Sequence, residues 1–499
     1  MSYARLHEHF RRVGQLDEIR AIVEWDQAVN MPDSAGDSRA ESMATLSRLR
    51  HQLLIEPRVS DLLEAAAAQT DLDPWQQANL REMRRQVRRA VAVPADLVEA
   101  TEHAEKKSEQ AWRRLRKEND FASYMPYLER VIQLTREAAA AVGQTLELES
   151  YDALLDGFEP GMRCDLVERA FRPLERFLPD FTDRVIERQK TVRAIVPPGP
   201  FDVDRQRRLG LRLLRDVGFD AERGRLDVSH HPFCGGVPTD VRITTRYDEN
   251  DFTSGLMGIL HEAGHGKYEQ GLPRRWLHQP VGLARGIALH ESQSLLLEMQ
   301  VCRGRAFLTY AAPLIREAFA ESASAEPGAY SPENLEALAL RVERGLIRVD
   351  ADEVTYPAHI LLRYEIERDL IEAHIEVRDL PEVWDAGMQK LLRLRTAGND
   401  RDGCLQDVHW PSGGFGYFPL YTIGAMIAAQ LFSKLASDAS DLAMQIEKGR
   451  FQQLDAWLSR FVWQLGSFCT TDEILQRATG ESLNPEFFID HLRRRYLPD

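Results

Sequence analysis

Cysteine is scarce in this chain of 499 residues. The five cysteines, Cys164, Cys234, Cys302, Cys404 and Cys469, are widely spaced along the sequence. Their number is odd and no two of them form a paired ligand motif, so the sequence does not favour a disulfide framework. This cysteine usage is typical of a reducing compartment, and we expect a cytoplasmic protein.

Long apolar runs and an excess of positive charge are also lacking. The longest apolar stretch, around 420–432, is too short to span a bilayer and contains Tyr421 and Gln430. Residues 1–12 alternate charged and apolar side chains, unlike a secretory leader. The formal net charge is −15, whereas nucleic acids and anionic membranes bind basic surfaces. We therefore expect neither nucleic acid nor a membrane as a partner.

Strand-like alternation is rare and is confined to residues 226–230 and 241–245. A Cys234-Gly235-Gly236 turn lies between them, and together they predict a small hairpin or sheet. Elsewhere, apolar residues recur every three or four positions, which is the pattern of helices that bury one face. The fold class is therefore predicted as mainly α, with a small β element.

Turn residues divide the helical pattern into segments. The sequence predicts helices at 38–54, 97–119, 166–192, 333–346 and 353–371, the last kinked at Pro357, and a turn at 152–162. Residues 97–119 carry both signs of charge, which favours an ion-paired, solvated helix face over a basic patch. Residues 196–200 form the clearest break, which could be a domain boundary or a loop.

One segment, 256–267, has the spacing of a metal-binding helix. His261 and His265 are four residues apart, so on a helix both imidazoles face the same side and can bind one ion. Glu262 lies beside them, where a carboxylate can take a proton from metal-bound water. Asp251 is the expected N-cap of this helix, and Gly271 is expected to end it.

A catalytic zinc ion needs a third protein ligand and one open position for water. A second helix, with polar residues in an apolar setting, is predicted at 286–299. It contains Glu291, which follows the second histidine by enough residues for a loop and a returning helix. Glu298 lies two turns further along the same face and is the competing ligand.

The motifs His261-Glu-Ala-Gly-His265 and His290-Glu-Ser-Gln-Ser294 resemble those of the carboxypeptidase Taq family of metallocarboxypeptidases. Further matching stretches lie at 231–233 (HPF), 240–244 (DVRIT), 347–352 (IRVDAD), 403–410 (GCLQDVHW), 25–26, 31–32, 151–155 and 159–162. The resemblance spans nearly the whole chain. It implies a single domain over 1–499 with a deep active-site groove, in which 196–200 is a loop between an N-terminal helical region (about 1–195) and a catalytic region (about 200–499).

The resemblance also implies a function. It selects Glu291 as the third ligand of a Zn²⁺ ion, for which Co²⁺ can substitute, and it implies a homodimer. The expected activity is release of the C-terminal residue from peptides with a free C-terminus, with Glu262 as the general base for zinc-activated water.

Carboxypeptidase action requires a cation near the metal, and arginine suits a terminal carboxylate because its planar fork binds both oxygens. Arg348 is the first candidate for this anchor and Arg242 is the second. The oxyanion needs a further donor, for which Tyr421 and His231 are candidates by resemblance. His409 completes the predicted substrate-binding set.

Two alternatives remain open. A zinc-dependent oligoendopeptidase would share the metal site but cut peptides internally. A non-enzymatic helical scaffold with structural zinc is disfavoured, because structural sites are closed and rich in thiolates, whereas the three predicted ligands leave a position open beside Glu262.

A long loop is predicted at 395–414, a length that compact domains seldom contain without a function. Gly413, Gly414 and Gly416 are interleaved with Phe415 and followed by Phe418. This segment could close over a substrate, or the two phenylalanines could pack into the core.

Overall fold

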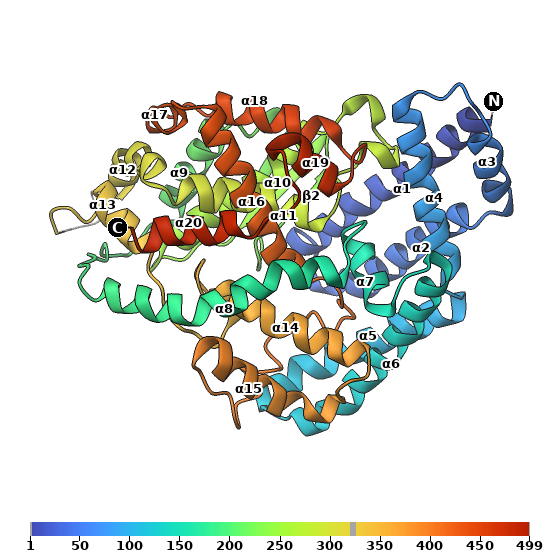
Figure 1. Ribbon diagram of the computed structural model, residues 1–499, viewed down its shortest axis with the longest axis horizontal. Helices are drawn as coiled ribbons and strands as arrows, with labels where there is room; N and C mark the ends of the chain where they lie inside the picture. Colours follow the sequence, from blue (N-terminus) through green and yellow to red (C-terminus); the bar gives the residue numbers. More distant parts are fainter. Residues whose placement is uncertain (1, 320–325, 499) are drawn as a thin grey trace.

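The computed structural model describes residues 2–319 and 326–498, and helices dominate it (Figure 1). The N-terminal region contains α1 (Ser2–Val29), α2 (Gly36–Leu54), α3 (Pro57–Ala67), α4 (Pro74–Ala92), α5 (Ala95–Glu118), α6 (Phe121–Leu146), α7 (Ser150–Phe158) and α8 (Cys164–Gln189). After residue 200 follow α9 (Val203–Asp216), α10 (Phe252–Gly271), α11 (Ile287–Leu295), α12 (Arg305–Phe319), α13 (Pro332–Ala339), α14 (Tyr356–Ile371), α15 (Leu380–Leu392), α16 (Pro419–Asp438), α17 (Leu442–Glu447), α18 (Gln452–Phe461), α19 (Thr471–Thr479) and α20 (Glu486–Tyr496). The mainly α fold class is confirmed.

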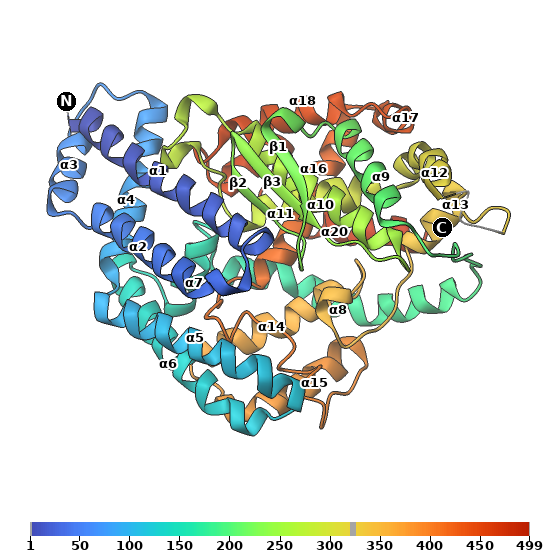
Figure 2. The ribbon, with the colours of Figure 1, turned by 180° about the vertical axis from the view of Figure 1, so that it is seen from behind.

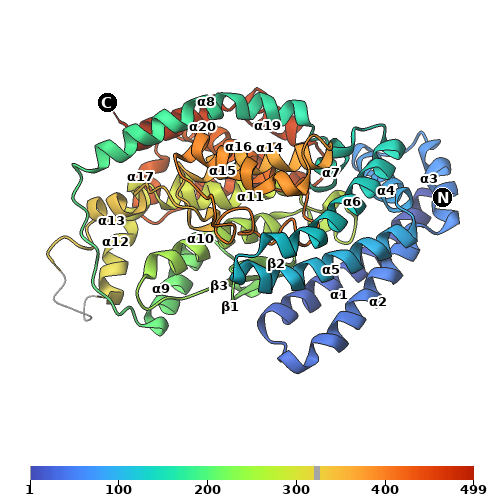
Figure 3. The same ribbon diagram turned by 90° about the horizontal axis from the view of Figure 1, so that it is seen from below.

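Three helices form the centre of the molecule. Helix α11 packs between α10 and α16, and the small sheet lies against α10 (Figures 1 and 2). Helices α1 to α4 gather at one end of the molecule, and Figure 3 shows α8 and α20 running side by side along one face. The central helices are therefore covered from several sides by segments that lie far apart in the sequence.

The ends of α10 and α11, the two central helices that carry the predicted metal ligands, can be compared with the sequence prediction. At the start of α10, the Asp251 side chain accepts a hydrogen bond of 2.8 Å from the backbone N–H of Thr253, as an N-cap does. The helix ends at Gly271, as predicted. Helix α11 ends at Leu295 and continues as a π-helical segment, η5 (Leu296–Cys302). The predicted single helix at 286–299 is therefore two segments with different winding.

Buried apolar side chains form two cores. The main core includes residues from α5 to α20 and so draws on both sides of the loop at 196–200. A second, smaller core lies between α1, α3 and α4, and Phe10, Leu63 and Met83 are among its members. The loop at 196–200 thus joins two segments that share one core.

The predicted β element is a small sheet, and the two predicted segments do not form a hairpin with each other. The sheet has three strands in the order β1 (Gly224–Val228), β3 (Asp240–Thr245), β2 (Cys234–Val237). Strands β1 and β3 are parallel, whereas β2 and β3 form the hairpin. The segment taken for a turn is strand β2, whose two glycines lack the β-branched signature of strands. Gly236 has φ of +84° and lies so close to the backbone of Asp240 that no Cβ would fit.

One turn prediction and two helix predictions also need correction. Residues 150–158 form α7 and only 159–161 form a turn, because Tyr151 and Leu155 are buried on one face of a helix. The helix predicted at 333–346 ends at Ala339. Helix α14 begins at Tyr356, so Pro357 lies in its first turn, where its missing N–H has no partner to lose, and produces no kink.

The predicted ion-paired face of α5 is confirmed. On α5, Arg113 pairs with Glu109 and Arg114 with Glu118, as expected for a solvated helix face. Each of the five cysteines is a free thiol. Among residues 2–319 and 326–498, no helix is both long and apolar enough to cross a membrane. Phe415 and Phe418 are buried, which favours core packing over a closing element.

Candidate active site

A groove of about 580 Å³ opens between the central helices. Its walls come from α10, α11, η5, α16 and the segment that leads into α14. The predicted site residues among its lining are His231, His261, Glu262, Glu291, Arg348 and Tyr421. Chain segments more than 150 residues apart thus bring these side chains to one surface.

The triad of His261, His265 and Glu291 converges at this groove, whose lining includes His261 and Glu291 but not His265. One ligand atom each from His261, His265 and Glu291 lie within 4.8 Å of one another. The Nε2 atoms of His261 and His265 are 3.9 and 3.5 Å from the two carboxylate oxygens of Glu291. Gly424 of α16 allows this approach, because a Cβ there would lie 2.9 Å from the Cβ of Glu291.

Glu298, the competing ligand, lies behind His261. One of its oxygens is 2.9 Å from the Nδ1 of His261, and the other accepts hydrogen bonds from Arg303 at 2.7 and 3.1 Å. Both oxygens are therefore engaged, and Glu298 holds the outer face of the imidazole whose Nε2 faces Glu291. We interpret Glu298 as a residue that orients His261.

Glu262 is the buried carboxylate on the groove side of the pair, and burial raises its pKa to about 7. Burial alone would lower the pKa of His261, but Glu298, Glu291 and Glu262 outweigh this and raise it to about 10. Burial lowers the pKa of His265 to about 4. The proton that His261 holds among these carboxylates is the one that a bound cation would displace.

The donor set fits a divalent metal ion. Two imidazole nitrogens and one carboxylate are the ligands of many catalytic zinc sites, and a fourth position would face the groove. Three carboxylates meet here, of which Glu262 and Glu298 are buried and Glu291 is partly buried, and Arg303 is the guanidinium that pairs with Glu298. The excess of negative charge favours a cation between the histidines and Glu291.

Sequence comparison identifies the family of the chain that carries this site. The sequence model described as carboxypeptidase Taq (M32) metallopeptidase matches residues 5–496. The chain belongs to this family. It is thus an enzyme of the metallocarboxypeptidase class, and a divalent metal is part of its chemistry.

The curated and structural relatives of this M32 chain cover almost its whole length. Thermostable carboxypeptidase 1 of Thermus thermophilus is 38% identical over 507 residues, covering 99% of this chain and 98% of the relative. Thermostable carboxypeptidase 1 of Pyrococcus furiosus is 34% identical over 492 residues, covering 98% and 97%. The solved structure of Trypanosoma cruzi metallocarboxypeptidase 1 superposes with a TM-score of 0.97 at 41% identity and covers 99% of both chains.

Arg348 of this M32 enzyme lies in a buried charge cluster at the groove wall. Its Nε and Nη2 donate to one oxygen of Asp407 at 3.1 and 2.8 Å, and its Nη1 donates to the Tyr356 hydroxyl at 2.8 Å. The other Asp407 oxygen accepts from Arg363, which is fully buried, at 2.7 Å. The backbone N–H of Arg348 donates to Gln406. The IRVDAD and GCLQDVHW motifs are therefore in direct contact.

The remaining predicted residues divide into two groups. Tyr421 and His231 line the groove. Arg242 does not line it: its side chain pairs with Asp240 and lies over the ring of Trp25. His409 is also absent from the groove lining and packs on Phe418, with ring centroids 4.4 Å apart. The geometry thus favours Arg348 over Arg242 as an anchor.

Sequence reasoning did not assign roles to Asp407, Arg363 or Tyr356. Asp407 lies in a matched motif, but neither its partners nor the burial of Arg363 can be read from the spacing. The only available signal was the arginine at position 363 in an otherwise apolar helix segment, since buried arginines are normally paired.

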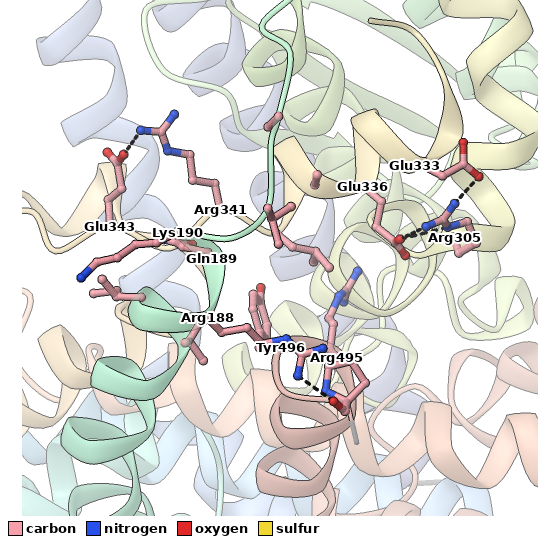
Figure 4. A pocket seen from close by; sticks show the side chains of 17 residues that line it. Arg188, Gln189, Lys190, Arg305, Glu333, Glu336, Arg341, Glu343, Arg495 and Tyr496 are labelled. Carbon is pink, nitrogen blue, oxygen red and sulfur yellow. Dashed lines mark hydrogen bonds and ion pairs between the residues drawn. The ribbon is translucent and has the colours of Figure 1, made fainter. Parts of the chain in front are cut away.

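A second hollow, of about 620 Å³, lies between α8, α13 and α20 (Figure 4). Several of its charged side chains pair with each other: Arg305 binds Glu333 and Glu336, and Arg341 binds Glu343. None of the predicted site residues lines this hollow. We therefore assign the chemistry to the groove.

Proposed function

We propose that this chain removes the C-terminal residue from peptides by metal-assisted hydrolysis in the groove. The observation that carries the proposal is a buried cluster with one unmatched positive charge in the same groove as the triad. Asp407 supplies one negative charge to two arginines, Arg348 and Arg363. The neighbouring His359 and His409 have pKa values lowered by burial to about 3 and about 4, so both are neutral at pH 7.

Arg348 has hydrogen-bonding capacity left for an anion. A guanidinium has five N–H groups, of which two point to Asp407 and one to the Tyr356 hydroxyl. One N–H therefore remains on each terminal nitrogen, in the arrangement that binds two oxygens of a carboxylate. A peptide's terminal carboxylate would neutralise the cluster, and this supports exopeptidase action.

We propose Zn²⁺ as the metal, with Co²⁺ as a substitute, held by His261, His265 and Glu291. Such an ion supplies Lewis acidity, which polarises a carbonyl and makes water a better nucleophile at neutral pH. The chain's own groups supply the rest. Glu262 accepts a proton from the attacking water and passes it to the leaving amine, and a pKa near 7 suits both directions of transfer.

Tyr421 and His231 are the proposed donors to the oxyanion, since both line the groove beside the triad. Burial raises the pKa of the Tyr421 hydroxyl well above its usual value, so the hydroxyl keeps its proton and can donate it. Family membership further supports peptides as substrates. We also propose a homodimer in the cytoplasm, which rests on the resemblance and on the cysteine usage.

A pair of matched peptides tests the proposal. A peptide with a free C-terminus offers a full negative charge to Arg348, and the amidated peptide does not. One charge-assisted hydrogen bond is worth roughly 1.5–3 kcal/mol, so amidation should reduce kcat/KM by about tenfold to more than a hundredfold. Arg348→Ala should remove this preference, and Arg348→Lys should restore only part of it because lysine lacks the fork.

Two further variants serve as controls. Arg246→Ala removes an exposed arginine that also lines the groove, and Arg242→Ala tests the second candidate anchor. Both should keep the preference for the free acid. Equal cleavage of both peptides by the unmodified enzyme, with internal fragments among the products, would contradict the proposal and favour the oligoendopeptidase.

A further inference from the structure

The second metal-binding candidate, His265, has a histidine neighbour on its outer side. The Nδ1 atoms of His265 and His290 are 2.7 Å apart, and their rings are stacked with centroids 4.7 Å apart. Two imidazole nitrogens at this distance share a single proton, since one must donate and the other accept. On its other side, His290 places Nε2 2.8 Å from a carboxylate oxygen of Glu269.

The proposed metal site fixes the direction of these hydrogen bonds. The Nε2 of His265 faces Glu291 at 3.5 Å, so this is the nitrogen that would bind the ion, and it must be unprotonated. The Nδ1 of His265 then carries the proton and donates it to His290. His290 accepts at Nδ1, so its neutral ring carries a proton on Nε2, which it donates to Glu269.

We propose that His290 and Glu269 are positioning residues that fix the tautomer and ring orientation of His265 for the metal. The inference rests on the proposed metal site. It gives the HES motif a second role, because His290 supports one ligand while the adjacent Glu291 is another. His290 thus contacts one proposed ligand, His265 of α10, and directly precedes another, Glu291 of α11.

The two histidine ligands are supported in different ways. His261 is held directly by Glu298, whose charge is compensated by Arg303 in a buried setting. His265 is held through an intervening imidazole, and its terminal carboxylate, Glu269, is about one-quarter exposed. His290 and Glu269 both line a separate cavity of about 420 Å³, whose wall includes α1 and β2. The hydrogen-bonded chain from His265 therefore ends at Glu269, which lines this separate cavity and not the peptide groove.

The surrounding packing holds His290 in place. Tyr268 also contacts its ring, with centroids 5.3 Å apart, and is itself buried. The Tyr268 hydroxyl accepts a hydrogen bond from the backbone N–H of Arg285. The His290 ring thus packs against both Tyr268 and His265, as an orienting group requires.

Metal affinity and the spectrum of the cobalt-loaded enzyme test the inference without any peptide. His290→Leu removes the acceptor, and we expect zinc affinity, measured by competition with a chelator, to fall about 10- to 100-fold. The visible absorption of the Co²⁺ form should shift, because His265 is no longer held in one orientation. His290→Asn keeps an amide oxygen near the position of Nδ1 and should recover much of the affinity.

Variants of Glu269, the last residue of the hydrogen-bonded chain from His265 through His290, give a second test. Glu269→Leu should weaken zinc binding, whereas Glu269→Gln keeps an oxygen that accepts from His290 and should weaken it less. His278→Leu is the control, since His278 lines the same cavity but pairs with Glu18 rather than with a metal ligand. It should leave both the affinity and the cobalt spectrum unchanged.

The outcomes separate this inference from the proposed function. If the unmodified enzyme binds no metal, the proposed function fails. If it binds metal but His290→Leu and Glu269→Leu retain its affinity and cobalt spectrum, His290 is only a bridge between α10 and α11 and the inference is overturned. If His290→Leu does not fold, the Glu269 pair and His290→Asn decide by the same two measurements.

Discussion

Three carboxylates surround the histidine pair, and the nearest partner of each determines what it can do. Both oxygens of Glu298 accept hydrogen bonds, one from His261 and the other from Arg303. Burial raises the pKa of Glu298, but Arg303 and His261 outweigh burial and lower it to about 2. Glu291 faces both Nε2 atoms. Glu262 is buried beside them without a cationic partner of its own, and its pKa is raised to about 7. These surroundings are the basis on which we propose orientation of His261 for Glu298, metal binding for Glu291 and proton transfer for Glu262.

This division predicts distinct mutant phenotypes at the residue scale. His261→Ala, His265→Ala and Glu291→Ala should each lose bound metal and activity together. Glu262→Gln should keep the metal and lose hydrolysis, because it removes a base and not a ligand. Metal content by elemental analysis, beside peptide hydrolysis, separates the two classes.

Glu298→Ala is the matched comparison for Glu291→Ala. It should retain the metal at high zinc concentration but with an affinity about 10- to 100-fold weaker, since it supports His261 without binding the ion. Full metal occupancy in Glu291→Ala together with complete loss in Glu298→Ala would show that the third ligand has been assigned wrongly.

A second residue-scale prediction concerns Glu353, whose carboxylate accepts hydrogen bonds from His491 and Tyr496 at 2.8 and 2.9 Å. Burial raises its pKa, but the charges of His491 and Arg495 outweigh burial and lower it from 4.5 to about 2. Because the folded pKa lies below the unfolded one, the stabilisation is full above about pH 5 and is lost as pH falls toward 2. The shift corresponds to about 3 kcal/mol.

The free energy of unfolding of the wild type and Glu353→Gln, measured by denaturant titration between pH 7 and 3, tests this. The difference between the two proteins should shrink as pH falls. Glu343→Gln is the control, because Glu343 is mostly exposed in its pair with Arg341 and should give a small, nearly constant difference. A Glu353→Gln difference that does not change with pH would refute the assignment.

At the scale of elements, the sequence predicted what depends on local chemistry. The N-cap Asp251, the end of α10 at Gly271 and the ion-paired face of α5 follow from residues close together in the chain. The turn predicted at 234–236 is wrong because β2 contains Gly235 and Gly236, which lack a strand signature, and pairs with β3. The contact of Arg363 with Asp407 spans 44 residues and could not be predicted from spacing.

The glycine in the HEAGH motif gives an element-scale prediction. A Cβ on Gly264 would lie 2.4 Å from the backbone oxygen of Gln293, so α10 and α11 touch through their backbones. Gly264→Ala should push the helices apart, disturb the contact of His265 with His290, and lower both Tm and zinc affinity. Gly258→Ala on the same helix is the control, because its Cβ would meet its neighbours at an ordinary 3.7 Å.

Gly258→Ala should bind zinc normally and fold at least as stably as the wild type, since alanine favours a helix over glycine by up to about 1 kcal/mol. Thermal unfolding and chelator competition on both variants give the comparison. Equal behaviour of the two alanine variants would mean that the close approach at Gly264 does not constrain the metal site.

At the scale of the whole molecule, the N-terminal region supports the start of the helix that carries Glu291. Glu159 accepts a hydrogen bond of 2.8 Å from the backbone N–H of Ala288, so a residue from before the loop at 196–200 caps the helix that carries Glu291. Asn79 of α4 contacts both Gln279 and Val281 on the approach to that helix. The two regions therefore depend on each other for the geometry of the groove.

This dependence predicts the result of cutting the chain at its clearest break. Val196 is 69% exposed, so a protease site inserted between Pro198 and Gly199 should be cleaved in the folded protein. The N-terminal fragment would contain α8, whose Leu174 and Leu178 are fully buried in the main core. Separating the fragments would expose this apolar surface to water, at about 25 cal/mol per Å².

The cleaved protein should therefore elute as one species in size-exclusion chromatography, unfold in one cooperative transition and retain bound zinc. Two soluble fragments that separate without denaturant and unfold cooperatively on their own would show instead that the chain has two domains. Mixing separately purified fragments extends the test. If Glu159 caps α11 as observed, zinc binding should require both fragments, because the C-terminal fragment alone contains the three proposed ligands but lacks the carboxylate that caps the helix carrying Glu291.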